Sequence, residues 1–184
     1  MSRNSSTVYH LIPAAIGQVG VVRRAGRGAL QRILLPRKGC SMDDLVREAF
    51  PGAVPEKAGR DPLCLQLRAF LGGEAVDFSI AGLDMEGVGG FARRVLMADH
   101  AIPRGRVMTY GGLATKLGIP GGARAVGNVM ARNPFPLIIP CHRVVGSGGD
   151  LHGFGGGLPM KRSLLTMEGV RFDGKGRVFS EYIV

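Results

Sequence analysis

One cysteine lies between a proline and a histidine, in the apolar run from Ile138 to Val145 that contains Pro140, Cys141 and His142. A thiol attacks only as the thiolate, and a nearby imidazole or positive charge lowers its pKa from about 8.5 toward neutrality. Cys141 is therefore a candidate nucleophile, with His142 as a candidate base. The competing interpretation is a small core residue, because free cysteine is often buried and neighbours in sequence need not be neighbours in the fold.

The other cysteines and histidines form no recognisable ligand set. Cys40 and Cys64 have no basic or histidine neighbour, so we interpret them as structural. Three cysteines at wide spacing favour a reducing compartment over a disulfide framework. No C-x-x-C or H-x-x-x-H pairing occurs, so we expect no metal.

The chain is strongly basic for its length of 184 residues. Lys plus Arg number 24 against 14 Asp plus Glu, which gives a net charge of +10, and arginine exceeds lysine. This balance indicates a polyanionic partner such as DNA or RNA, although charge can also serve solubility alone. The polar start and the interruptions at Pro13, Gln18 and Arg23 predict neither a secretory signal nor a membrane span, and we expect a cytoplasmic protein, or a nuclear one in a eukaryote.

Residues 1–84 read as a small α/β domain, an antiparallel sheet with helices. Short β-rich runs at 19–22 and 30–35 flank a basic, glycine-rich turn at 23–28 and predict a hairpin. Helices are expected after Ser41 and after Asp61, each an N-cap residue, with ends at Pro51-Gly52 and Gly72-Gly73. A strand is expected at 76–80, and the glycine-rich stretch 82–90 indicates the domain boundary.

Residues 85–184 read as a mostly helical domain. Apolar spacing predicts a helix containing Val88, Phe91 and Leu96, and a last helix from Pro159 to Gly169. Between them, helices at 110–117 and 123–132 flank a breaker at 118–122, which is helix-turn-helix spacing. Helical hairpins are common, so this spacing alone is weak evidence of DNA binding.

The start of the second helix of this pair sharpens the interpretation. Ala123, Ala125 and Gly127 surround Arg124 with small residues, so the helix could approach a narrow groove while one arginine projects. A reader of the major groove would carry several long polar side chains instead. The pattern favours the minor groove and displacement of a base.

Several ordered motifs resemble the O6-alkylguanine-DNA alkyltransferases, also called methylated-DNA–protein-cysteine methyltransferases. The similarity extends from about Phe91 to Gly169, whereas residues 1–82 show little motif-level similarity. The motifs are Ile102-Pro103-x-Gly105 with Tyr110, Arg124-Ala125-Val126-Gly127, Asn133-Pro134, Ile139-Pro140-Cys141-His142-Arg143-Val144, and Gly156-Gly157 through Lys161, Leu164-Leu165 and Glu168-Gly169.

The resemblance implies DNA repair by direct reversal: the alkyl group of a flipped-out O6-alkylguanine is transferred irreversibly to Cys141, with O4-alkylthymine as a possible second substrate. His142 would take the thiol proton through water, Glu168 would orient the imidazole, and Asn133 would act as a hinge. No cofactor is implied. The partner would be double-stranded DNA bound through its minor groove by a monomer with a winged-helix-like C-terminal domain.

The same resemblance implies the substrate and DNA contacts. Arg124 would fill the space left by the flipped base, and Tyr110 would crowd a phosphate and assist flipping. Lys161 and Tyr110 would help the guanine leave. The remaining expected contacts are Ala123, Ala125, Gly127, Val144 and Gly155.

Two alternatives stay open at this point. An alkyltransferase-like protein recognises the lesion without accepting the alkyl group, but such proteins typically have tryptophan in place of the cysteine, and this chain has Cys141 and no Trp. A thiol hydrolase using Cys141 and His142 would leave Arg124 and the net charge unexplained. Phe154, Gly155 and His152 depart from the family pattern, so the contacts of that loop are open; His152 is interpreted as solvated.

Overall fold

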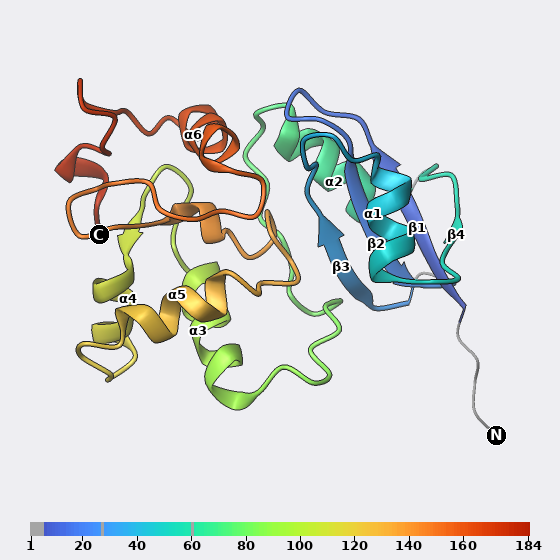
Figure 1. Ribbon diagram of the computed structural model, residues 1–184, viewed down its shortest axis with the longest axis horizontal. Helices are drawn as coiled ribbons and strands as arrows, with labels where there is room; N and C mark the ends of the chain where they lie inside the picture. The colour runs from blue at the N-terminus through green and yellow to red at the C-terminus, as the bar shows by residue number, and fades with distance from the viewer. Residues whose placement is uncertain (1–5, 27, 60) are drawn as a thin grey trace. The chain divides into compact units, whose positions relative to one another are not determined.

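The computed structural model describes residues 6–184 except residues 27 and 60, and it divides into two compact units, 1–84 and 85–184 (Figure 1). Arg27, within the expected basic turn, lies outside the described residues.

The first unit is built on a four-stranded sheet in the order β3-β2-β1-β4. Strands β1 (Thr7–Ile12), β2 (Val19–Arg24) and β3 (Leu30–Leu34) pair antiparallel, and the short β4 (Val54–Pro55) adds to β1 in parallel. The sheet is therefore mixed, which corrects the purely antiparallel expectation. The hairpin of β2 and β3 is confirmed.

Two helices complete this α/β unit, and their caps explain their bounds. In α1 (Met42–Ala49) the Ser41 side chain accepts a hydrogen bond from the Asp44 amide, and in α2 (Pro62–Leu71) Asp61 accepts one from the Cys64 amide. Both predicted starts are confirmed. The buried residues of α1 pack on strands β1 and β2 in one core cluster: Tyr9, Val22, Met42, Leu45 and Val46.

The strand expected at 76–80 is wrong. This segment has no strand pairing; instead Phe78 is buried and packs edge-on against Phe70, with ring centroids 5.6 Å apart. The chain reaches the sheet just afterwards, where Leu83 forms an isolated bridge with Leu30. Side-chain burial, rather than a backbone ladder, accounts for the apolar character of the segment.

The second unit is mostly helical. It contains α3 (Gly90–His100), α4 (Tyr110–Lys116), α5 (Ala123–Met130) and α6 (Leu158–Met167). Val88 precedes α3 rather than belonging to it, because the helix starts only at Gly90. Short 3-10 helices lie at Cys141–Arg143 (η1) and Ser180–Tyr182 (η2).

A two-stranded parallel ladder brings distant segments of this unit together. Met108 and Thr109 (β5) pair with Val144 and Val145 (β6), so the start of α4 lies beside the chain leaving Cys141. Beneath the ladder lies a core cluster of Val107, Val145, Leu165, Val170 and Val178. The sequence reasoning did not foresee this ladder, which positions the site.

Candidate active site

Cys141 lies in the 3-10 turn η1 and is 8% exposed. Two hydrogen bonds of Asn133 hold the segment before it. Asn133 Oδ1 accepts a hydrogen bond from the Phe135 amide, and Asn133 Nδ2 donates one to the Ile139 carbonyl at 2.8 Å. Leu137 has a φ of 77°, a left-handed conformation that is costly for a branched side chain, and it is itself buried. Asn133 therefore ties the end of α5 to the loop that carries the thiol.

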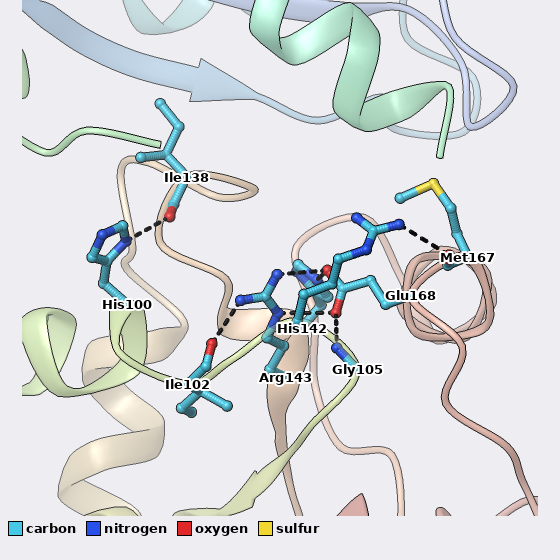
Figure 2. A network of polar contacts seen from close by, with 9 residues as sticks. His100, Ile102, Gly105, Ile138, His142, Arg143, Met167 and Glu168 are labelled. Carbon is cyan, nitrogen blue, oxygen red and sulfur yellow. Dashed lines mark hydrogen bonds and ion pairs between the residues drawn. The ribbon is translucent and has the colours of Figure 1, made fainter. Parts of the chain in front are cut away.

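His142 and Glu168 face each other in the interior. Their side chains are fully buried, and His142 Nε2 lies 2.9 Å from Glu168 Oε1. Figure 2 shows the Glu168 carboxylate between His142 and Arg143, with the Gly105 amide beside it. The pair predicted as base and orienter is thus in hydrogen-bonding contact.

Arg143 completes this buried network. Its Nε and Nη2 donate to the two oxygens of Glu168 at 2.9 and 2.8 Å, and its Nη1 donates to the Ile102 carbonyl at 2.7 Å. Gly105, with a φ of 74°, allows the 102–105 turn to approach, because a Cβ there would lie 3.0 Å from the Glu168 carbonyl oxygen. Arg143 was named in the motif but given no role by sequence reasoning.

The charges of this network determine its protonation. Burial alone would raise the pKa of Glu168, but hydrogen bonds from His142 and Arg143 outweigh it and lower that pKa to about 2. Burial lowers the pKa of His142, because the charged imidazolium would lose its hydration; Glu168 opposes this effect, and the charges of Arg143 and Lys161 add to it. His142 is therefore neutral at pH 7 and able to accept a proton.

Cys141 itself is not activated in the way its sequence neighbours suggest. Burial raises the pKa of its thiol to about 12, with Asp99 adding to the effect; a hydrogen bond with Asn133 and the charge of Lys161 oppose it only in part. The expected lowering toward neutrality is therefore wrong, and Cys141 is a protonated thiol at pH 7.

A cavity of about 680 Å³ opens beside Cys141. The residues that line it include no acid, and five of the predicted substrate residues lie in it with Cys141: Tyr110, Ala123, Arg124, Gly127 and Gly155. A Cβ at Gly155 would meet nothing within 4 Å. His152, interpreted as solvated, lies on the wall against Gly146, with Phe154 and Ser147 nearby in the lining.

Three predicted contacts are not in this cavity. Ala125 lines a separate groove of about 420 Å³ between α3 and α5. Val144 is fully buried, and it contributes its carbonyl, which accepts a hydrogen bond from Lys161 Nζ at 2.6 Å. Lys161 is also fully buried and donates to the His152 carbonyl at 2.8 Å, so it is bonded to the loop that lines the cavity.

Two further findings bear on the class of site. Among the described residues no group of three or more His, Cys, Asp or Glu is arranged to hold a metal ion. Across the same part of the chain, no helix is both long and apolar enough to cross a membrane. The second unit thus presents a buried thiol on the same turn as His142, whose imidazole is hydrogen-bonded to Glu168, and these residue types define a Cys–His–Glu class of site.

Comparison with known proteins identifies the family. Residues 90–170 match the model described as 6-O-methylguanine DNA methyltransferase, DNA binding domain. A methylated-DNA–protein-cysteine methyltransferase of Mycobacterium leprae is 44% identical over 127 residues, 69% of this chain and 76% of that protein. The chain therefore belongs to the methylated-DNA–protein-cysteine methyltransferase family.

Two other relatives define the extent of the similarity. The enzyme of the same name from Methanothermobacter thermautotrophicus is 45% identical over 109 residues, 59% of this chain and 61% of its own length. The crystal structure of Mycobacterium tuberculosis OGT in complex with DNA has a TM-score of 0.72 and 33% identity, covering 87% of this chain and 91% of that one. The structural similarity thus includes much of the first unit, where the motifs gave no guidance.

Proposed function

We propose that this protein repairs O6-alkylguanine in double-stranded DNA by transferring the alkyl group once, irreversibly, to Cys141. The observation that carries the proposal is Cys141 at the wall of an open cavity that also contains Arg124, behind which His142 and Glu168 are hydrogen-bonded. Family membership and the DNA complex of the mycobacterial relative support the same substrate.

The proposed step is a displacement at the alkyl carbon. The bond from sulfur to carbon forms as the bond from carbon to O6 of guanine breaks; the thiol proton passes to neutral His142 through water, and the departing guanine takes up a proton. Glu168 and Arg143 keep the imidazole oriented and the network neutral overall. Because a thioether is a poor leaving group, each molecule reacts once.

We propose that α4 and α5 form the helix-turn-helix of a winged-helix-like domain that docks on the minor groove. Thr109 caps α4, the connection spans residues 117–122, and Ala123, Arg124 and Gly127 face the cavity from α5. The exposed Arg124 would occupy the space of the flipped base. Tyr110, at the first position of α4, would crowd the phosphate, since it lines the same cavity.

A duplex oligonucleotide containing one O6-methylguanine tests the function. We expect the lesion to disappear with a stoichiometry of one per protein molecule and with no further turnover. Cys141→Ser should retain binding and lose repair. Binding by the unaltered protein without loss of the lesion would identify a recognition-only protein, and repeated turnover would contradict the single-use mechanism.

Arg124→Ala tests the flipping role. The rate of repair of duplex DNA by this variant should fall at least about tenfold. Flipping a base costs a few kcal/mol, and the variant lacks the side chain that would fill the vacated space in the duplex. Reaction with free O6-benzylguanine should change little. Arg132→Ala is the control, because Arg132 follows the end of α5 and lines the other groove rather than the cavity. Equal losses on both substrates would remove the flipping role.

A further inference from the structure

Asp99 is a buried acid that the mechanism above does not use. It lies in the last turn of α3, on the same face as buried Val95 and Leu96, and it is 0% exposed. Neither carboxyl oxygen makes a hydrogen bond with any residue that the structure describes. Buried polar side chains nearly always have a partner, so an acid in this state needs an explanation.

The groups within electrostatic range of Asp99 come from three other elements. They are Cys141 and Arg143 on η1, Lys161 on α6 and Tyr110 on α4. The nearby cations are engaged elsewhere: Arg143 donates to Glu168 and the Ile102 carbonyl, and Lys161 donates to two carbonyls. Burial raises the pKa of Asp99 to about 8, although Arg143 and Lys161 oppose it, so the carboxyl is neutral at pH 7.

We propose that Asp99 is a positioning residue for alkyl transfer that acts through the Cys141 thiol: transfer proceeds while the Asp99 carboxyl is protonated, and its ionisation suppresses the reaction. The inference rests on the proposed function. An ionised carboxylate in the same buried cluster would oppose formation of the thiolate, because like charges repel strongly where the dielectric is low. Asp99 keeps its own proton during the step; the thiol proton still goes to His142.

Lys161 is the one neighbour that titrates in the same range, since burial lowers its pKa to about 8. Loss of its charge would also disfavour the thiolate. A bend in the wild-type pH profile could therefore arise from either group. The comparison with Asp99→Asn separates them, because the amide is isosteric and cannot ionise, whereas Lys161 still titrates in that variant.

The test is the single-turnover rate of methyl transfer from a saturating O6-methylguanine duplex between pH 6.5 and pH 9. We expect the ratio of the Asp99→Asn rate to the wild-type rate to be constant up to about pH 7 and to rise at least about threefold by pH 9. Asp77→Asn, at an exposed position, is the matched control and should give a constant ratio.

A second measurement does not depend on catalysis. An acid whose pKa is raised by folding removes stability between its unfolded and folded pKa values. The melting temperature of Asp99→Asn relative to wild type should therefore rise between pH 4.5 and pH 8. An equal difference at both pH values would show that Asp99 is not protonated in the folded protein.

The possible outcomes separate the two proposals. A constant rate ratio with normal wild-type transfer overturns the role of Asp99 and leaves the proposed function intact. A variant that is slow at every pH also overturns it, because the carboxyl itself would then be required. If the wild-type protein transfers no methyl group at any pH, the proposed function fails and the inference fails with it.

Discussion

Glu168 is the residue on which the buried polar network depends. It accepts hydrogen bonds from Arg143 through both oxygens and faces His142, and its side chain is fully buried. Removing one partner of a buried ion pair lowers stability far more than replacing both partners with apolar residues, because it leaves a buried charge without a counter-charge. Glu168 therefore links the stability of the second unit to the protonation state of the candidate base.

Glu168→Gln should destabilise the protein by about 3 to 5 kcal/mol at pH 7, because Arg143 would remain buried without its counter-charge. Urea unfolding at fixed pH measures this difference. Glu181→Gln, which removes an exposed ion pair with Arg171, should change stability far less, because solvent screens that pair. Equal effects of the two substitutions would contradict the account of the network.

The same carboxyl predicts how stability depends on acid. Its pKa is about 2 in the folded protein and 4.5 ordinarily, so its contribution is complete above about pH 4.5 and is lost as the pH falls toward 2. The unfolding free energy of the wild type should decline through this window more steeply than that of Glu168→Gln. Parallel declines would show that Glu168 is not the group that titrates.

At the residue scale, the motifs predicted more than the local chemistry did. His142 and Glu168 are hydrogen-bonded as the resemblance implied, yet the Cys141 thiol has a raised pKa because burial outweighs its neighbours. Val144 and Lys161 are fully buried and do not line the cavity, which no local sequence pattern indicates. Asp99 could have been noticed as an acid three and four positions after Leu96 and Val95, on an apolar helix face.

At the element scale, α5 separates two surfaces. Ala123, Arg124 and Gly127 face the cavity, whereas Ala125 and Asn128 face the groove against α3. Gly127 lies inside the helix, where glycine costs stability relative to alanine. We infer that its small size serves close approach to DNA.

Gly127→Ala should therefore stabilise the protein by about 0.5 to 1 kcal/mol and slow duplex repair several-fold. Its methyl group would lie 3.9 Å from the Tyr110 ring, which is an ordinary van der Waals contact, so the fold can accommodate the substitution. Thermal melting and single-turnover repair measure the two effects. Asn128→Ala should also stabilise the helix but leave the repair rate unchanged. A Gly127→Ala protein that is more stable and repairs duplex DNA at the wild-type rate would contradict the role of Gly127 in close approach to DNA.

Elements with their own local signals could be predicted from the sequence, and elements that depend on a distant partner could not. Ser41 and Asp61 cap their helices with side-chain hydrogen bonds, so the starts of α1 and α2 can be predicted from residues close in the sequence. Strands β4, β5 and β6 have two residues each and exist only through their pairing partners. That pairing, absent from any local pattern, brings Tyr110 beside Cys141.

At the scale of the whole molecule, the positive charge is unevenly distributed. Residues 85–184 contain thirteen lysines and arginines against six acids, whereas residues 1–84 contain eleven against eight. The excess thus accumulates in the unit that carries the cavity and Arg124. This distribution fits DNA binding mainly through the second unit.

DNA affinity should consequently fall steeply with salt. When the logarithm of the association constant is plotted against the logarithm of the salt concentration, each phosphate contact contributes about −0.9 to the slope. Arg124→Ala should therefore change the magnitude of this slope by no more than about 1. Titrations of a labelled duplex from low to moderate salt measure it. The reaction with free O6-benzylguanine should show no comparable dependence, and a salt-independent duplex affinity would contradict the electrostatic account.

The central claim is that Cys141 accepts the alkyl group, and the most direct measurement is the peptide mass after reaction with an O6-methylguanine duplex. The account predicts a gain of one methyl group on the peptide containing Cys141, with none on the peptides containing Cys40 or Cys64. An unmodified Cys141 peptide after the lesion has disappeared, or a methyl group on another residue, would contradict it.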